Sequence, residues 1–220
     1  MSSRSNPEWT GSVNVNVPSA ARMYDYWLGG SHNFAADREA AEAVLATRPG
    51  VRYMARANRA FVGRAVRFLA GSGIRQFLDL GSGIPTVDSV HAVASRTAPD
   101  ARVVYVDIDP VAVAHSAHLL PAGGRAAVIL ADLRKPAEIL DHPSVRSVLD
   151  PDLPTAVLMM SVLQFVAGRE AYDVVGHVAS ALAPGSYLAV SHICQEAVTD
   201  AAERDRIGAV YRRTATSEAE

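Results

Sequence analysis

Five short apolar segments, each followed by a stretch with helical spacing, fill the chain from residue 74 to residue 213. We predict that these segments are strands, over residues 74–80, 102–107, 126–131, 155–161 and 186–192. Continuously apolar strands that alternate with helices are typical of a parallel sheet covered on both faces. Because strand–helix–strand crossovers are right-handed, the sequence predicts an α/β fold, a doubly wound and mostly parallel sheet of the Rossmann-like type.

The first third of the chain has helical periodicity and no strand pattern. We expect a helix with Ser19 as its N-cap that stops at Gly29, a second helix from Asp37 to about Thr47, and a third over residues 51–70. The third helix is expected to bury one stripe, made of Met54, Ala57, Phe61, Ala65, Phe68 and Leu69.

The domain organisation follows from this change of pattern. We predict a flexible lead over residues 1–18, a helical cap over 19–73, a Rossmann-like ligand-binding domain over 74–213 and a polar tail over 214–220.

Composition argues against several classes of function. Cys194 is the only cysteine, so no intrachain disulfide can form, and the seven histidines show no spacing that predicts a metal site. The net charge of −2, with both signs interleaved, gives no reason to expect a nucleic-acid partner. No apolar run approaches the roughly 18 residues of a membrane span, and the polar N-terminus has no signal-peptide core. We therefore expect a cytoplasmic protein with no membrane partner.

Ligands of doubly wound sheets bind beyond the carboxyl ends of the strands. The turn after the first predicted strand carries Asp79, Gly81, Ser82 and Gly83, and its glycines let the backbone approach a ligand closely. An NAD fingerprint would place a third glycine where Thr86 stands, and the Asp79 carboxylate would repel a pyrophosphate. The same carboxylate suits a ligand with an ammonium and a sulfonium, which favours S-adenosylmethionine (SAM) over NAD.

Acids also follow the second and third predicted strands. Asp107, with Ile108 beside it, is placed to accept from both ribose hydroxyls. Asp132 and Leu133 are placed for the adenine amine and ring. A single acid at such a position is often a helix cap, as we expect for Asp109. The three acids lie at equivalent positions, each at the end of a predicted strand, and they match the ammonium, sugar and base of one cofactor. We therefore infer that the chain binds SAM.

Three motifs resemble those of class I SAM-dependent methyltransferases: Asp79-Leu-Gly-Ser-Gly83, Tyr105-Val-Asp107 and Ala131-Asp132-Leu133. Two N-terminal motifs are more specific: Met23-Tyr-Asp-Tyr-Trp-Leu-Gly-Gly-Ser-His-Asn-Phe-Ala-Ala-Asp37 and Arg56-Ala-Asn-Arg-Ala-Phe61. Together they are similar to an actinobacterial SAM-dependent methyltransferase family long described only as a domain of unknown function. The resemblance runs from about Ser19 to Arg213. It implies a helical cap over the cofactor and leaves the methyl acceptor open.

The end of the sequence departs from the class I pattern, in which strands six and seven form an antiparallel pair beside strand five. Residues 214–220 are small and polar and do not predict strands. We therefore expect either a truncated chain or a partner that covers strand five, because an uncovered apolar edge promotes aggregation. The second alternative predicts a homodimer through the strand-five edge.

Several side chains outside the three acids are candidates for the cofactor site. One of Tyr24, Tyr26 and Trp27 in the first predicted helix is expected to close over the ligand, and we take Tyr24. Asn58, a poor helix former inside a helix, is expected to make a polar contact. Arg56 or its neighbour Arg59 is expected to bind the SAM carboxylate, and we take Arg56. Ser161 and Gln164, at and after the end of strand four, are expected at the methionine end of the cofactor.

Methyl transfer from a sulfonium is an in-line displacement, so the protein has mainly to position the acceptor and in some cases to remove a proton. His192 at the end of strand five is the first candidate for this base, and His32 in the cap loop is the second. The Asp/Asn-Pro-Pro-aromatic turn typical of enzymes that methylate nucleobase amines is absent after strand four. The sequence thus predicts methylation of an oxygen or nitrogen of a small molecule. The alternative is a non-catalytic SAM-binding protein with an incomplete fold.

Overall fold

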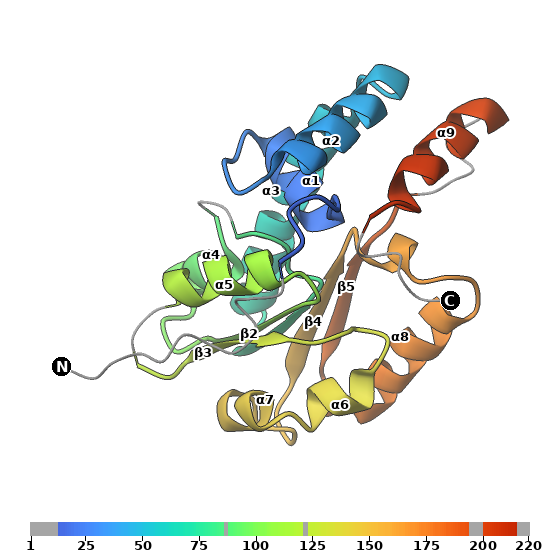
Figure 1. Ribbon diagram of the computed structural model, residues 1–220. Helices are drawn as coiled ribbons and strands as arrows, with labels where there is room; N and C mark the ends of the chain where they lie inside the picture. The colour runs from blue at the N-terminus through green and yellow to red at the C-terminus, as the bar shows by residue number, and fades with distance from the viewer. Residues whose placement is uncertain (1–12, 86–87, 121–122, 194–199, 215–220) are drawn as a thin grey trace.

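An all-parallel sheet forms the centre of the molecule (Figure 1). The computed structural model describes residues 13–85, 88–120, 123–193 and 200–214. Within these residues the strands are β1 (Gln76–Leu80), β2 (Arg102–Asp107), β3 (Ala126–Leu130), β4 (Thr155–Met160) and β5 (Tyr187–Ser191). They pair in parallel in the order β3-β2-β1-β4-β5. The strand order reverses between β1 and β4, so the prediction of a doubly wound sheet is confirmed.

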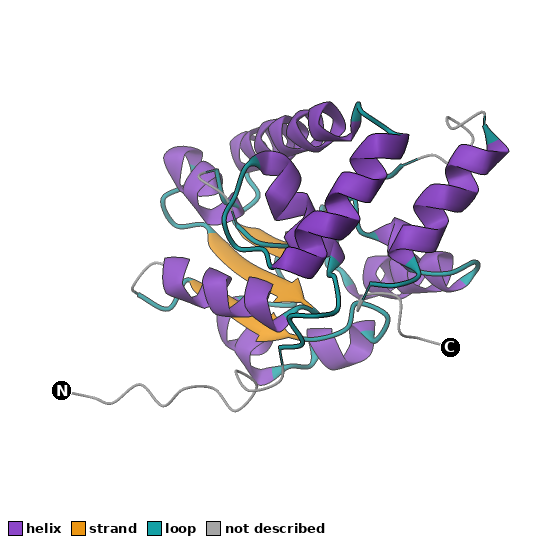
Figure 2. Ribbon diagram, turned by 45° about the horizontal axis from the view of Figure 1, so that its top comes forward, coloured by secondary structure: helices purple, strands orange, loops and turns teal. Residues whose placement is uncertain are grey.

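Helices cover both faces of the sheet (Figures 1 and 2). One face carries α3 (Val51–Gly71), α4 (Val90–Thr97) and α5 (Pro110–Leu119), and the other carries α6 (Pro136–Leu140), α7 (Pro143–Val148) and α8 (Glu170–Ala181). Side chains of β1 alternate between two cores, with Phe77 in the core of α3 and α4 and Leu78 in the core of α6, α7 and α8. Asp79 therefore shares the face that α3 covers.

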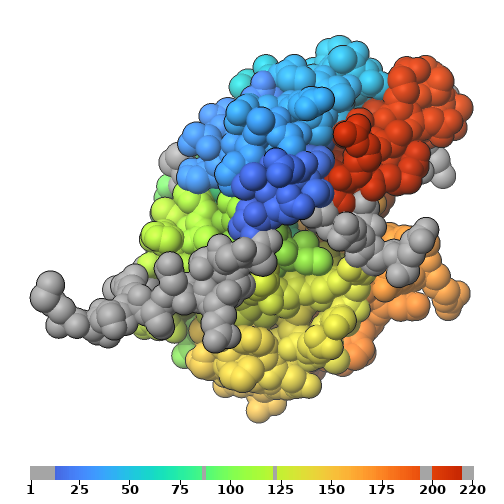
Figure 3. All heavy atoms as spheres, in the orientation of Figure 1, coloured from blue at the N-terminus to red at the C-terminus, as the bar shows by residue number. Residues whose placement is uncertain are grey.

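A small third core joins the N-terminal helices. α1 (Ala20–Leu28), α2 (Ala35–Thr47) and the first half of α3 enclose the buried side chains of Met23, Trp27 and Val44. α9 (Ala201–Tyr211) lies beside α2, and its Tyr211 packs against this core. The cap and α9 thus form one layer, as Figure 3 shows. In Figure 1 this layer lies beyond the carboxyl ends of β4 and β5.

A buried arginine connects the cap to the sheet domain through hydrogen bonds and ion pairs. The Nε of Arg22 donates to both carboxylate oxygens of Asp37, at 3.0 and 2.9 Å. Its Nη1 lies 3.4 Å from Oδ2 of Asp109, the N-cap residue of α5. All three side chains are at most 4% exposed. Because buried charges are stable only when they are paired and hydrogen-bonded, this network holds α1, α2 and α5 together.

Two helices differ from the sequence predictions. α2 begins two residues before Asp37, which lies in the first turn and accepts from the Phe34 backbone N–H at 2.7 Å. In α3 the predicted buried stripe is wrong in part, because Phe68 is 66% exposed whereas Val62 and Val66 are buried. Both sets of residues have the same helical spacing, and periodicity alone does not decide which set faces the sheet.

Two short elements were not predicted from the sequence, and some predictions concern residues outside the described ranges. α7 and the 3₁₀ turn η2 (Leu163–Phe165) are too short to give a periodic pattern. Residues 1–12 of the predicted lead, Thr86, Cys194 and residues 215–220 of the predicted tail lie outside the described residues. Among the described helices, none is long and apolar enough to span a bilayer.

β5 forms one edge of the described sheet. Its side chains Tyr187, Leu188 and Val190 are 43%, 37% and 41% exposed, respectively. Strands six and seven do not occur within the described ranges, as we expected from the sequence. The homodimer through this edge and the cytoplasmic location stay predictions.

Candidate functional site

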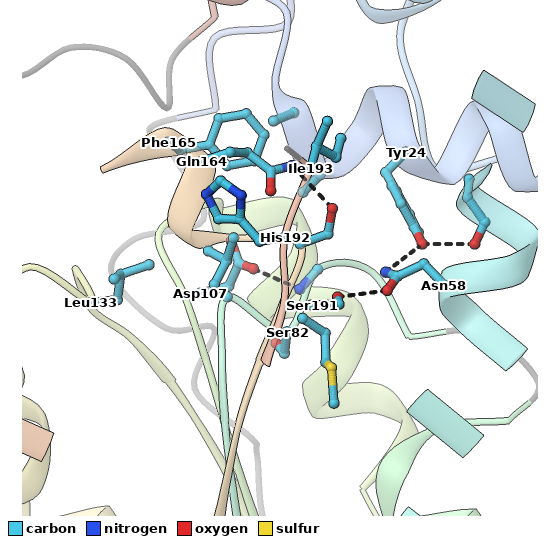
Figure 4. Close-up of a pocket in the computed structure, with 18 of the residues that line it drawn as sticks. Tyr24, Asn58, Ser82, Asp107, Leu133, Gln164, Phe165, Ser191, His192 and Ile193 are labelled. Atoms are coloured by element: carbon cyan, nitrogen blue, oxygen red, sulfur yellow. Dashed lines mark hydrogen bonds between the residues drawn. The ribbon is translucent and has the colours of Figure 1, made fainter. Parts of the chain in front are cut away.

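One cavity of about 460 Å³ lies at the carboxyl ends of the strands, beneath the cap and α9. The segments that follow all five strands contribute to its lining, together with α1, α3 and α9. Figure 4 shows side chains that surround it. This is the edge of a doubly wound sheet where loops on either side of the order reversal diverge and leave space for a ligand.

The turn after β1 requires glycine at two positions. Gly81 and Gly83 have φ values of +71° and +63°, in the left-handed region. A Cβ on Gly81 would overlap the side chain of Val162, whereas a Cβ on Gly83 would meet no atom within 4 Å. Between them, the buried Ser82 hydroxyl has no hydrogen-bond partner within the described part of the chain. The turn therefore offers an unsatisfied hydroxyl and an open backbone to a ligand.

Asp79 is a buried carboxyl group in β1, with 5% of its surface exposed. Burial raises its pKa to about 7, while the Arg59 guanidinium opposes the rise and the nearby Asp107 carboxylate adds to it. A cationic ligand would stabilise the ionised form of such a group. Asp79 therefore has the electrostatic environment of an ammonium-binding residue.

Arg59, and not Arg56, reaches the cavity. Arg59 lines it, and its Nη2 donates to the backbone carbonyl of Asp88 at 3.0 Å. Arg56 is exposed, and it is not among the residues that line the cavity. The two arginines are three residues apart on α3, so the rotation of this helix decides which of them faces the ligand.

Asp107 ends β2 and braces the turn after β1. Its Oδ2 accepts from the Gly83 N–H at 2.7 Å, and its Oδ1 accepts from the Asp109 N–H at 2.8 Å. Burial raises the pKa of Asp107 to about 6 in spite of these backbone hydrogen bonds. Each carboxylate oxygen keeps accepting capacity for a ligand hydroxyl. Ile108, the next residue, also lines the cavity.

Asp132 differs from the other two acids because it is paired. Arg134 donates to both of its oxygens, with Nε at 3.0 and 2.9 Å and Nη2 at 2.6 Å. Burial acts to raise the Asp132 pKa, but the hydrogen bonds and charge of Arg134 outweigh it and lower the pKa. Asp132 is thus ionised at neutral pH, and it lines the cavity beside Leu133.

A chain of hydrogen bonds connects the cap to the end of β5 (Figure 4). The Tyr24 hydroxyl donates to the Ala55 carbonyl at 2.8 Å and accepts from Nδ2 of Asn58 at 3.1 Å. Oδ1 of Asn58 accepts from the Ser191 hydroxyl at 2.6 Å. Asn58 therefore bridges α1 and β5, which explains a poor helix former at a mid-helix position.

The ends of β4 and β5 form a second polar side of the cavity. Ser161 has φ +58° and is the sole non-glycine residue with positive φ among those described. Its Oγ accepts from Nε2 of Gln164 at 3.0 Å, and its N–H donates to the Ser191 carbonyl at 2.9 Å. Ser161, Gln164 and the exposed His192 all line the cavity. Strained backbone of this kind is concentrated at functional sites.

The part of the cavity beneath the cap and α9 is apolar and aromatic. Trp27, Met54, Phe165 and Tyr211 line it, and the ring centroids of Phe165 and Tyr211 lie 5.4 Å apart. Burial raises the Tyr211 pKa, so its phenol is neutral at physiological pH. We call these four residues the aromatic wall. Such a wall suits an apolar ligand body.

Nearly all the site residues predicted from the sequence converge on this cavity. Those that line it are Tyr24, Asn58, Asp79, Gly81, Ser82, Gly83, Asp107, Ile108, Asp132, Leu133, Ser161 and His192. Arg56 and His32 do not. The backbone N–H of His32 donates to buried Asp25 at 2.9 Å, and its ring packs on His115 with centroids 3.7 Å apart. These contacts direct His32 toward α5, so its interpretation as a base has no geometric support.

Apart from Trp27, the aromatic wall is the part of the site that sequence reasoning missed. Met54, Phe165 and Tyr211 read as ordinary core residues, and they come from segments far apart in the chain. No sequence signal marks them as neighbours. Within the ranges that the structure describes, no group of three or more His, Cys, Asp or Glu side chains is arranged to hold a metal ion.

Comparison with known proteins places the chain in a family. Residues 7–218 match the S-adenosyl methyltransferase family. A candidate methyltransferase of Thermobifida fusca is 41% identical, with a TM-score of 0.86 over 95% of this chain and 79% of that protein. A DUF574 family protein of Streptomyces avermitilis is 40% identical, with a TM-score of 0.84 over 90% of this chain and 77% of that protein. No protein with a curated function matches.

The family match spans nearly the whole chain, and it agrees with the strand order, the glycine turn and the acids at the cavity. The resemblance drawn from the N-terminal motifs is thereby confirmed. The chain belongs to the S-adenosyl methyltransferase family and is a SAM-dependent methyltransferase.

Proposed function

We propose that this methyltransferase acts on an oxygen or nitrogen atom of a small molecule, which binds between the three acids and the aromatic wall. The observation that carries the proposal is the convergence of Asp79, Asp107 and Asp132, from three neighbouring strands, on one cavity. The volume of about 460 Å³ falls within the range of small-molecule sites.

The residues at the carboxyl ends of the strands fit SAM part by part. Asp132 and Leu133 at β3 are assigned to the adenine, and Asp107 at β2 to the ribose hydroxyls. Asp79 at β1 is assigned to the ammonium, because its raised pKa makes it responsive to a positive charge. Arg59, which lines the cavity and whose charge acts on Asp79, is assigned to the SAM carboxylate.

When bound, SAM supplies a methyl group on a sulfonium that needs no further activation. The protein then has to hold the acceptor in line, to exclude water and to take up a proton. We assign the exclusion of water to the cap and the aromatic wall, which cover the cavity on the side of α1, α3 and α9. His192, which follows Ser191 of the hydrogen-bonded chain, is assigned to the proton.

The proposal is tested by calorimetric titration with SAM and S-adenosylhomocysteine (SAH), followed by a product screen with methyl-labelled SAM. We expect both compounds to bind and the label to enter a small-molecule fraction. Binding without transfer to any acceptor would favour the alternative, a non-catalytic SAM-binding protein. Label in a protein or nucleic-acid fraction would contradict the small-molecule assignment.

Replacing Arg59 by methionine is expected to weaken SAH binding roughly 10- to 100-fold, because a charge-assisted hydrogen bond to the carboxylate is lost. Arg56→Met is the matched control, since Arg56 lies on the same helix and is exposed outside the cavity. Calorimetry measures both affinities. Equal losses in the two variants, or a larger loss in Arg56→Met, would show that Arg59 does not bind the carboxylate.

Replacing His192 by glutamine is expected to lower kcat by roughly 100-fold while the SAH affinity stays unchanged, as for the removal of a general base. Single-turnover rates with labelled SAM provide the measurement. Wild-type turnover in His192→Gln would remove this residue from the mechanism.

A further inference from the structure

The strand order assigns one side of the cavity to the acceptor. Along the sheet edge, the acids at β3, β2 and β1 are assigned in turn to the base, the sugar and the ammonium of SAM. The next strands in the same direction are β4 and β5. Because in-line transfer needs the acceptor on the side of the methyl group away from sulfur, the acceptor meets the residues that follow β4 and β5.

Gln164 is the residue after β4 with an unsatisfied polar atom. Its Nε2 is engaged by Ser161, but its Oε1 is buried and has no hydrogen-bond partner among the described residues. Leaving a buried acceptor unpaired costs about 1–3 kcal/mol. The strained φ of Ser161 and its hydrogen bond hold the amide in this position. An atom held unpaired at a cavity is typical of a ligand contact.

Gln164 and His192 come from neighbouring strand ends. The Ser161 N–H donates to the carbonyl of Ser191, the residue before His192, and Ser161 also holds the Gln164 amide. Figure 4 shows the Gln164 amide and the His192 ring on the same side of the cavity. One acceptor molecule can therefore contact both side chains, giving a proton to one and a hydrogen bond to the other.

The aromatic wall restricts the chemical nature of the acceptor that can bind beside it. Phe165 directly follows Gln164, and its ring packs against Tyr211 from α9. Trp27 and Met54 line the same region from the cap. Paired rings and a thioether bind planar aromatic groups well through stacking and sulfur–aromatic contacts.

Resting on the proposed function, we propose that the acceptor is an aromatic molecule with two hydrogen-bond donors at or beside the methylated atom, as in a vicinal diphenol or an aromatic amine. Gln164 is the specificity-determining residue: its Oε1 accepts from the donor that is not methylated. The acceptor's nucleophilic oxygen or nitrogen forms its bond to the methyl carbon as the carbon–sulfur bond breaks with its electron pair on sulfur. The proton of that oxygen or nitrogen passes to His192.

The test compares matched probes for binding to the protein–SAH complex by calorimetry. One pair is 2,3-dihydroxynaphthalene and its monomethyl ether, and the other is 1-naphthylamine and its N-methyl derivative. We expect the member with the additional donor to bind roughly 10- to 100-fold more tightly in at least one pair. Gln164→Met should bring that ratio close to one, and Gln164→Glu, which still accepts, should keep it.

The outcomes separate this inference from the proposed function. If SAH itself does not bind, the proposed function fails. If SAH binds but neither pair shows a preference, or no probe binds, only the acceptor class is overturned. A preference that survives in Gln164→Met, or disappears in Gln164→Glu, would also overturn the role of Oε1. Unchanged SAH affinity and melting temperature in both variants confirm that they are folded.

Discussion

Replacing Asp79 by asparagine is expected to stabilise the ligand-free protein at pH 8 while it weakens SAM binding more than 100-fold. The Asp79 carboxyl has a pKa of about 7 in the folded protein, against 3.8 for the unperturbed group. The folded state therefore binds this proton more tightly than the unfolded state does. The stability that the protonated Asp79 carboxyl contributes is fully present below about pH 4 and is lost as the pH rises through 7.

The size of this effect follows from the pKa difference. At pH 8 the ionised Asp79 costs up to about 4 kcal/mol, because each pKa unit corresponds to about 1.4 kcal/mol. An asparagine of the same shape carries no charge, so most of that cost disappears. We expect a rise in melting temperature of up to roughly 8–16 °C at pH 8. At pH 5 we expect roughly a third of that rise, because the carboxyl of the unfolded chain is already mostly ionised there. SAM binding is lost because the ammonium no longer has a carboxylate partner.

Thermal unfolding of wild type and variant between pH 5 and pH 8, with SAH titrations at pH 8, measures both effects. Asp132→Asn is the control, because Arg134 lowers the pKa of Asp132 against the effect of burial. The same replacement there should not raise the melting temperature at pH 8. A less stable Asp79→Asn at pH 8 would contradict the electrostatic account of the site.

Replacing Asp37 by asparagine is expected to destabilise the protein by about 3–5 kcal/mol, because it leaves the buried Arg22 guanidinium partly uncompensated. Arg22 and Asp37 are 3% and 0% exposed, and their contact holds α1 on α2. The corresponding fall in melting temperature is roughly 6–20 °C for a chain of this size.

An exposed ion pair provides the comparison for this variant. Arg52 lies 3.1 Å from Glu42, with both side chains about half exposed. Arg52→Met should cost less than about 1 kcal/mol. Urea unfolding of both variants measures the two losses. A loss in Asp37→Asn no larger than that in Arg52→Met would show that the buried network contributes little to stability.

The strands and acids were predictable from the sequence because each carries a local signal. A run of apolar residues defines a strand, and an acid at its end is placed at the ligand edge by the parallel topology alone. Asp79, Asp107 and Asp132 therefore came together as expected. Glycines with positive φ after β1 likewise follow from a local requirement of the turn.

Features that depend on tertiary packing were not predictable in the same way. Arg56 and Arg59 lie on one helix, and only the packing of α3 against the sheet and α4 makes Arg59 face the cavity. His32 was directed away from the site by Asp25 and by an imidazole on α5, both of which are brought near it by the fold. Gln164 was expected near the cavity, but the unpaired state of its Oε1 depends on the fold of the short turn η2 and could not be predicted.

The buried Arg22 has a consequence for how the protein responds to its cofactor. Arg22 contacts the Asp109 side chain, while the Asp109 backbone N–H donates to the Asp107 carboxylate assigned to the ribose. The loop from Asp107 to Asp109 thus contacts the cap through one side chain and forms part of the cofactor site through the other. Such coupling is reciprocal, so SAM binding should slow amide hydrogen exchange in α1 and α2, and a loosened cap should weaken SAM binding by the same factor.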